Sequence, residues 1–364
     1  MQKAFTTLFL LALLTSVPVQ SRSGYEIPHP KPLSGKGDTL IVFIIGDVMM
    51  HERQFGFDHR QFLEKISHRM READICAANM EFTLAGSPYS GYPAFSCPEY
   101  MAEYVGGECG ADILLTANNH ILDKGQKGLA RTLEIYSSLG DSLGTRYAGS
   151  ARSEAEREGN FPLFIRKKGF RIAFINCTYG TNAVSHEGWP KTEYMERKNL
   201  AEAFLKAREA DFTIALPHWG DEYKLRHSAS QEEWAQWMVE QGADAIVGAH
   251  PHVVQDTTHI NGVPVIYSIG NAVSNMSAEN TRLELAVTLR FVSDPVSGEK
   301  TMLEPELHFL WCCLPGRLTD SYSTIFIKEW SGRRSDWLIP GDYDNMIETL
   351  RRVRSATGIS RNTL

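Results

Sequence analysis

Short apolar segments alternate with segments of helical periodicity along most of this chain, and this alternation limits the folds it can adopt. The apolar runs are TLIVFIIGD at 39–47, ADICAANME at 73–81, ADILLTANNH at 111–120, FRIAFINCT at 170–178, DFTIALPHWGDE at 211–222, ADAIVGAHPH at 243–252 and VPVIYSIGN at 263–271. Apolar residues at helical spacing predict helices at 55–73, 125–139, 196–209 and 230–241. Strands that alternate with helices predict an α/β fold.

The later part of the chain has a different pattern. ELAVTLRF at 284–291 and MLEPELHFL at 302–310 predict antiparallel strands. Residues 311–364 lose the alternation and contain several arginines, so we expect a C-terminal extension after a main domain at 38–310.

The N-terminus is typical of a secretory signal peptide at 1–21. Lys3 precedes an apolar run that is short for a membrane span, and Val19 and Ser21 are small enough for the −3 and −1 positions of a cleavage site. Residues 22–37 are rich in Pro, Gly and Ser, and predict a linker. We therefore expect a secreted, periplasmic or cell-surface protein, with membrane association only if this N-terminus stays uncleaved.

Six cysteines bear on the expected redox chemistry. An oxidising compartment permits disulfides, and Cys97 with Cys109 is the candidate pair, since no C-x-x-C unit is present. Cys76 and Cys177 lie in apolar strand-like runs, where buried free thiols are expected.

The charge balance argues against a polyanionic nucleic-acid partner. The formal net charge is −7, and no block of Lys and Arg is long enough to suggest a basic patch. Nucleic acid is therefore not an expected partner.

Polar residues that can bind metals or transfer protons end most of the apolar runs. In α/β sheets, sites form outside the carboxyl ends of the strands, so these residues would meet at one edge. They are Asp47, Glu81, Asn118, Asn119, His120, His218, His250, His252 and Asn271. Singly, each has an ordinary explanation as a helix cap, a turn residue or a surface side chain. Together, carboxylate, amide and imidazole groups predict a site for one or two divalent ions, with Mn, Fe or Zn as candidates.

The His-Pro-His segment at 250–252 has its own geometric consequence. Pro251 disfavours the helical conformation at His250 and predicts an extended backbone there. Residues two apart in an extended segment project to the same side, so His250 and His252 would present their imidazoles together.

Six stretches together resemble a known family. They are GDVMMH, NMEFTLAG, LLTANNHILDKG, PHWGDEY, GAHPHVVQ and YSIGNAV, in this order between residues 46 and 273. They are similar to the poly-γ-glutamate capsule-biosynthesis proteins of the calcineurin-like metallophosphatase superfamily. The resemblance implies a four-layer α/β sandwich.

The resemblance also implies roles for individual residues. The metal ligands would be Asp47, Glu81, Asn119, His218, His250 and His252. His120 would act as general acid or stabilise developing charge, with Asp123 either orienting it or capping the following helix. Candidate substrate-side residues are His51, Arg53, Asn118, Trp219 and Asn271, although ordinary packing is the favoured role for Trp219.

Two departures from the metallophosphatase pattern weaken the expectation of ordinary phosphoesterase chemistry. Met49 stands where those enzymes carry a histidine, and a thioether does not replace an imidazole on a hard cation. His51 is a candidate substitute. Glu81 stands where an aspartate is usual, so one metal position could be altered or empty.

Three functions remain open from the sequence. The first is a metal-dependent hydrolase or transferase that acts on poly-γ-glutamate or a related anionic cell-envelope polymer, alongside capsule-synthesis partner proteins. The second is a non-catalytic polymer-binding or export accessory protein. The third is a metal-dependent phosphoesterase.

Overall fold

The computed structural model describes residues 38–184 and 187–359. The predicted signal peptide at 1–21 and linker at 22–37 lie outside these residues. In the part of the chain that is described, none of the helices combines the length and apolar character that crossing a membrane requires.

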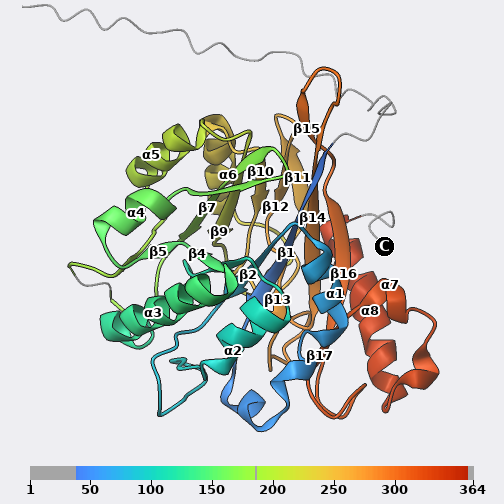
Figure 1. The fold of residues 1–364 in the computed structure, drawn as a ribbon. Helices are drawn as coiled ribbons and strands as arrows, with labels where there is room; N and C mark the ends of the chain where they lie inside the picture. The colour runs from blue at the N-terminus through green and yellow to red at the C-terminus, as the bar shows by residue number, and fades with distance from the viewer. Residues whose placement is uncertain (1–37, 185–186, 360–364) are drawn as a thin grey trace, which may run out of the picture. The chain divides into compact units, whose positions relative to one another are not determined.

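The first sheet is built around the N-terminal apolar run (Figure 1). Its strand order is β17-β16-β14-β1-β2-β3-β4, with β13 paired to β1 and β15 to β14. Strands β1 to β4 are parallel, whereas β14, β16 and β17 run antiparallel to their neighbours. The bounds are β1 Thr39–Val48, β2 Ile75–Met80, β3 Ile113–Leu115, β4 Arg146–Ala148, β13 Asn271–Val273, β14 Leu283–Ser293, β15 Lys300–Met302, β16 Glu306–Cys313 and β17 Ser323–Phe326.

The second sheet contains the histidine-bearing runs. Its order is β11-β12-β10-β9-β7-β6, and the central strands β12, β10, β9 and β7 are parallel. The bounds are β6 Leu163–Lys167, β7 Phe170–Thr178, β9 Phe212–His218, β10 Ala245–Val247, β11 Thr257–Ile260 and β12 Val263–Ile266. A small separate pair joins β5 (Ser150–Ala151) to β8 (Lys191–Thr192).

Helices cover the outer faces of the two sheets and create four layers (Figure 1). One core cluster joins the first sheet to α1 and α3, a second lies between the sheets, and a third joins the second sheet to α5 and α6. The helix bounds are α1 Glu64–Glu72, α2 Tyr100–Glu103, α3 Gly125–Leu143, α4 Glu154–Asn160, α5 Arg197–Ala207, α6 Ala229–Gln241, α7 Ile327–Trp330 and α8 Pro340–Thr357. The expected four-layer α/β sandwich is therefore confirmed.

Strand β1 is apolar on both faces because each face packs against a hydrophobic core. Val42 and Ile44 pack between the sheets, while Phe43 and Ile45 pack toward α1 and α3. A strand with cores on both sides has no solvent face and needs no polar alternation. Each fully buried side chain of this size contributes about 1.5–3 kcal/mol.

The helix predicted at 55–73 is wrong in its first half. Short 3-10 turns at Glu52–Gly56 and His59–Gln61 precede α1, which begins only at Glu64. The Asp58 side chain accepts a hydrogen bond from the Arg60 amide, so it caps the second turn locally. The other three predicted helices correspond to α3, α5 and α6.

The residues after 310 belong to the same sheet and cores. Strand β16 runs through residue 310 to Cys313, and β17 pairs with it at the edge of the first sheet. Helix α8 places Met346, Leu350 and Val353 in the core between the sheets. The predicted strand at 302–310 is divided, because residues 303–305 separate β15 from β16.

All six cysteines are buried free thiols. The expectation is confirmed for Cys76 and Cys177, but the candidate Cys97–Cys109 disulfide is wrong. Both of its members instead pack in the hydrophobic cluster beneath α1 and α3.

Candidate metal centre

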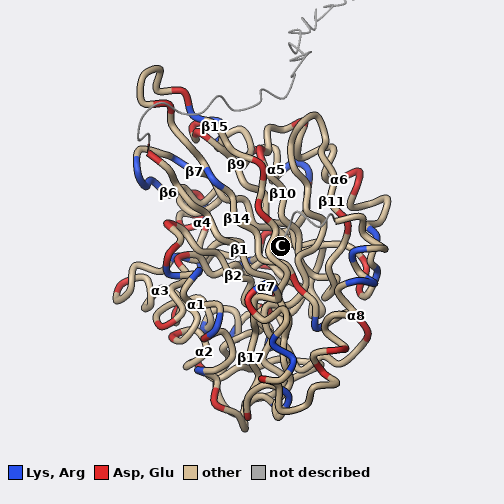
Figure 2. The backbone as a smooth tube through the Cα atoms, turned by 90° about the vertical axis from the view of Figure 1, so that its right-hand side faces the viewer, with Lys and Arg blue, Asp and Glu red and all other residues tan. Residues whose placement is uncertain are grey.

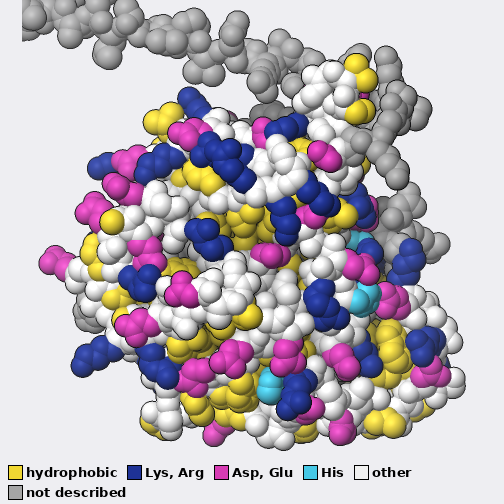
Figure 3. Space-filling view, viewed as in Figure 1, with side chains coloured by type: hydrophobic (Ala, Val, Ile, Leu, Met, Phe, Trp, Pro, Cys, Tyr) yellow, Lys and Arg dark blue, Asp and Glu magenta, His cyan; other side chains and the backbone are white. Residues whose placement is uncertain are grey.

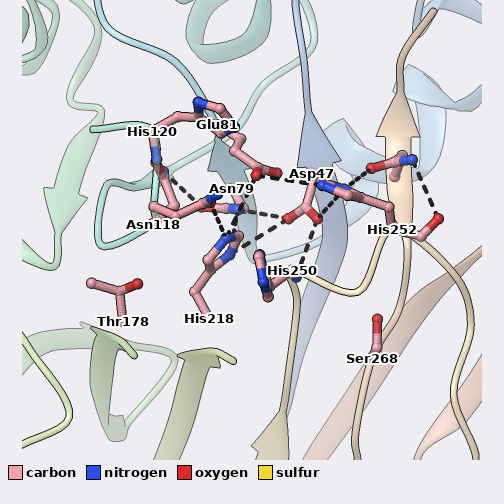
Figure 4. Close-up of polar contacts among 12 residues, drawn as sticks. Asp47, Asn79, Glu81, Asn118, His120, Thr178, His218, His250, His252 and Ser268 are labelled. Carbon is pink, nitrogen blue, oxygen red and sulfur yellow. Dashed lines mark hydrogen bonds and ion pairs between the residues drawn. The ribbon is translucent and has the colours of Figure 1, made fainter. Parts of the chain in front are cut away.

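Strands of both sheets end close together, and polar side chains at or just after their carboxyl ends lie in one place (Figure 4). Asp47 lies near the end of β1, and Glu81 directly follows β2. His218 ends β9, while His250 and His252 follow β10. The chain is very close-packed behind Asp47: a Cβ at Gly46 would lie 1.9 Å from the Gly270 carbonyl oxygen.

Three groups of side chains have the spacing needed to hold a metal ion. In each group the possible ligand atoms lie within 4.8 Å of one another. The groups are Glu81 with His218 and His250, Asp47 with Glu81 and His252, and Glu222 with His250 and His252. Glu81 belongs to the first two groups, so its carboxylate is shared between them.

Asp47 is a buried carboxylate held in its charged form. Its Oδ1 accepts a hydrogen bond from Asn79 Nδ2 at 2.6 Å, and Oδ2 accepts one from the His250 amide at 3.2 Å. Burial opposes ionisation, but the contact with His252 and the charge of His218 outweigh it and lower the pKa to about 2. Asp47 therefore presents a permanent negative charge to the centre.

Glu81 and His250 leave polar atoms without protein partners. Both Glu81 carboxylate oxygens and His250 Nδ1 are buried and have no hydrogen-bond partner in the structure. Burial, together with the neighbouring Asp47 charge, raises the pKa of Glu81 well above its usual value. Buried polar atoms are normally paired, so these orphans fit a bound cation. This donor set of carboxylates and imidazoles suits Mn, Fe or Zn.

His218 is fixed by two amides. Its Nε2 donates to Asn119 Oδ1 at 2.8 Å, and its Nδ1 lies 3.3 Å from Asn79 Nδ2. Nε2 is also 3.6 Å from Glu81 Oε1. Burial lowers the pKa of His218 to about 3, which keeps the imidazole neutral, the form that binds metals. Asn119 thus contacts the His218 ring directly.

His120 and Asp123 form a buried pair next to the centre. His120 Nδ1 donates to Asp123 Oδ2 at 2.7 Å, and the same oxygen accepts a hydrogen bond from the Phe95 amide. The residue at the cap position of α3 is Lys124, so Asp123 orients His120 and does not cap the helix. The His120 amide also donates to Asn118 Oδ1.

The His-Pro-His backbone differs from its predicted extended form. His250 has φ of +100° and His252 has φ of +58°, both in the region that non-glycine residues rarely adopt. The rings still lie together, with centroids 5.9 Å apart. The His250 amide bonds Asp47, and Pro251 O accepts from the Tyr223 amide, so tertiary hydrogen bonds hold the strained conformation.

The five residues expected on the substrate side divide into two kinds. Asn271 and Asn118 are buried: Asn271 Oδ1 accepts from His252 Nδ1 at 2.8 Å, and Asn118 Nδ2 donates to Met80 O. Trp219 is 1% exposed and donates from Nε1 to a backbone carbonyl, so it supports the core and does not line an open surface.

The other two lie on the turn after β1. His51 is half-buried, with Nδ1 near Gln54 Oε1 and the Asn275 amide. Arg53 is exposed on the 3-10 turn that follows.

Sequence reasoning missed two residues of the centre and one residue at its rim. Asn79 was read as part of an apolar strand, although a buried amide two residues before Glu81 is a signal in itself. Glu222 lies on the loop after β9 and gives no sequence signal beyond its place in PHWGDEY. Asn182, whose amide donates to Asn119 O, comes from a loop far from any recognised motif.

Comparisons with known proteins identify the family of the chain. A family model described as "Bacterial capsule synthesis protein PGA_cap" matches residues 41–276, which is more than half of the chain. The capsule biosynthesis protein CapA of Bacillus anthracis is 27% identical over 266 residues, 68% of this chain and 62% of that protein. The PGA biosynthesis protein CapA of Bacillus subtilis is 26% identical over 273 residues, 70% of this chain and 68% of that protein.

Among solved structures, a Mycoplasma pneumoniae phosphatase aligns with a TM-score of 0.45 at 14% identity, over 75% of this chain and 94% of that chain. The matched family segment contains every residue of the three ligand groups. The chain therefore belongs to the PGA_cap family of bacterial capsule synthesis proteins.

Proposed function

We propose that the protein is a metal-dependent hydrolase or transferase that acts outside the cytoplasm on poly-γ-glutamate or a related anionic cell-envelope polymer. The observation that carries the proposal is the buried carboxyl group of Glu81, which has no hydrogen-bond partner among the described residues while facing three histidines. A protein that only binds a polymer has no use for such a group, because a buried polar group without a partner costs stability.

The described residues would hold one or two ions. Asp47 and His252 form one ligand group with Glu81, and His218 and His250 form another. A divalent cation bound there supplies Lewis-acid activation of water and of the substrate's carbonyl or phosphoryl group.

His120 is positioned for proton transfer at the edge of this centre. Asp123 accepts a hydrogen bond from His120 Nδ1. This bond fixes the ring tautomer and leaves Nε2 as the nitrogen that can exchange a proton with a substrate. The Asn182 side chain lies 3.4 Å from Nε2 and would be displaced or rearranged when substrate is bound.

Two tyrosines mark the solvent side of the centre. Tyr179 is 51% exposed, and its ring centroid lies 4.6 Å from that of His250. Tyr223 is 47% exposed, and its ring lies 6.2 Å from that of His252. We infer that substrate approaches between these rings.

The protein's own charges give a polyanion little general attraction. Basic and acidic residues alternate along the backbone and over the face in view (Figures 2 and 3). Arg131, a basic residue of α3, is already paired with Glu99 at 2.5 Å. The bound cations themselves would therefore provide the positive charge for an anionic substrate.

One observation favours the alternative of a non-catalytic accessory protein. Met49, which replaces the expected imidazole, is 2% exposed in the core beneath α1 and α3 and cannot approach an ion. If the ligand group that contains Asp47 binds its ion too weakly, the protein would hold a single ion. A two-ion reaction would then not take place.

Metal content and turnover on defined substrates test the proposal. The full chain, stripped and reconstituted with Mn²⁺, Fe²⁺ or Zn²⁺, is analysed for ions per chain, and then incubated with poly-γ-glutamate and with a phosphodiester. We expect shortened or transferred polymer with the wild type and loss of activity in His120→Ala. His259→Ala is the matched control, since this histidine is exposed and pairs with Glu304.

The possible outcomes separate the alternatives. Bound metal without turnover on either substrate would favour the accessory protein, and turnover on the phosphodiester alone would favour a phosphoesterase. Fractionation of cells that express the full chain tests the proposed location outside the cytoplasm.

A further inference from the structure

Glu222 is an exposed acid that the fold brings to the solvent side of the buried centre. Its carboxylate lies within 4.8 Å of ligand atoms of both His250 and His252. The other carboxylates of the centre, Asp47 and Glu81, are fully buried. The neighbours of His250 and His252 therefore include one accessible carboxylate and two inaccessible ones.

The loop that carries Glu222 is held in place by specific contacts. The Tyr223 amide donates to Pro251 O at 2.9 Å, although Tyr223 itself has φ of +64°. The buried Gln255 side chain donates to the carbonyls of Lys224 and Arg226 at 3.0 and 3.2 Å. These contacts join the loop to the His-Pro-His segment and its continuation, so Glu222 keeps its position relative to the histidines.

The buried side chains supply too few ligands to complete the coordination of an ion. His250 Nδ1 is buried and has no hydrogen-bond partner. Met49 lies in the hydrophobic core, so β1 supplies only Asp47 to the second ligand group. Divalent ions of this class normally take four or more ligands. Asp47, Glu81 and His252 alone give three.

We propose that Glu222 is a metal ligand that joins His250 and His252 and closes the centre from the solvent side. This role rests on the proposed metal-dependent function. In it, Glu81 binds metal from within the core, and Glu222 binds metal from the surface. Because Glu222 is exposed, it is also the ligand that an incoming substrate oxygen can most readily replace.

Metal-binding measurements on the full chain test this role without an activity assay. Metal-free wild type, Glu222→Gln and Asp221→Asn are titrated with Co²⁺ and with Mn²⁺ against a competing chelator. The visible spectrum of the Co²⁺ form reports changes in ligand number. Asp221→Asn is the matched control, because it removes the same charge from the neighbouring exposed position of the same loop. Circular dichroism and thermal unfolding of the metal-free variants verify that each is folded.

We expect Glu222→Gln to weaken binding of at least one ion by about tenfold or more and to change the Co²⁺ spectrum. Asp221→Asn should alter affinity by less than about fivefold, as expected for a solvent-screened charge, with an unchanged spectrum. Equal effects of the two variants, or an unchanged spectrum in Glu222→Gln, would overturn the proposal for Glu222 and leave the metal centre intact. A wild type that binds no ion stoichiometrically would overturn the metal centre itself, and the role of Glu222 with it.

Discussion

Two buried clusters of charged residues in this protein are built in opposite ways. Near α8, the Arg282 guanidinium donates to both carboxylate oxygens of Asp342 at 2.7 and 2.6 Å and to Cys312 O at 2.8 Å. The same guanidinium lies 4.3 Å from the Trp311 ring centroid. In the candidate metal centre, by contrast, the Glu81 oxygens and His250 Nδ1 have no hydrogen-bond partner within residues 38–184 and 187–359.

The difference teaches how to recognise a functional cluster among buried charges. The pair of Arg282 and Asp342 balances its own charge and each of the three guanidinium nitrogens donates a hydrogen bond, so the pair needs no outside ion. The centre around Glu81 gathers two carboxyl groups and three imidazoles, and the Glu81 oxygens and His250 Nδ1 have no hydrogen-bond partner among the described residues, so a cation from outside the chain can complete it. Variants of the two clusters should therefore separate stability from metal binding.

The largest expected effect is on the self-compensated cluster. Arg282→Ala leaves Asp342 buried without a partner and should lower the free energy of unfolding by about 3–5 kcal/mol, measured by urea denaturation. Metal affinity should not change. Arg290→Ala, which breaks a partly exposed pair with Glu306, is the control and should cost less than about 1 kcal/mol. Equal losses in the two variants would contradict the distinction.

In the metal centre, loss of a charged group should weaken metal binding without lowering the stability of the metal-free protein. Glu81→Gln removes an orphaned buried carboxyl but keeps its shape, so the metal-free variant should be as stable as the wild type or more stable. Its affinity for divalent ions should fall by about 100-fold or more, since even outer ligand partners are worth ~10–100-fold. Calorimetric titration and thermal unfolding without metal measure the two effects. A large loss of metal-free stability with affinity preserved would assign Glu81 to the structure and not to metal binding.

A smaller effect is expected on the pH dependence of the metal-free protein. The pKa of His218 is about 3 when folded, against about 6.5 as its ordinary value, because burial disfavours the charged ring. Between these two values the unfolded chain binds more protons, so the stability held above about pH 6.5 declines as pH falls toward 3. The slope is up to about 1.4 kcal/mol per pH unit for each such histidine.

Urea unfolding across this pH range checks the slope, and His218→Gln should flatten it. A His218→Gln curve parallel to that of the wild type would show that this histidine does not carry the acid sensitivity.

The smallest effect is expected at the rim of the centre. Asn182 is exposed and contacts His120, but it belongs to none of the three ligand groups. Asn182→Ala should change stability by no more than about 0.5 kcal/mol and leave metal affinity unaltered. A strong loss of metal binding in this variant would mean that the loop after β7 forms part of the centre.

Much of the centre could be predicted because strand ends are visible in the sequence. Asp47, Glu81, His218 and the His-Pro-His histidines each follow an apolar run, and parallel strands bring their carboxyl ends to one edge. Asn79 was hidden because an amide inside a buried strand is read as part of an apolar run. Glu222 was missed because an exposed loop acid has no periodicity, and only the contacts of Tyr223 and Gln255 place it.

Long-range contacts override local preferences in two regions of the chain. Pro251 favours an extended His250, yet the hydrogen bond from its amide to Asp47, more than 200 residues away in sequence, holds φ at +100°. Residues after 310 lose their periodicity, yet β16 and β17 complete the first sheet, because pairing with β14 supplies the order that local patterning lacks.

The sequence by itself determined the alternation of strands and helices, the family and most of the ligand set, since these depend on residue types and short spacings. Only the tertiary structure decided that one buried charge cluster is neutralised from within and the other is not. That distinction depends on which atoms meet across sheets and loops, and no local spacing carries this information.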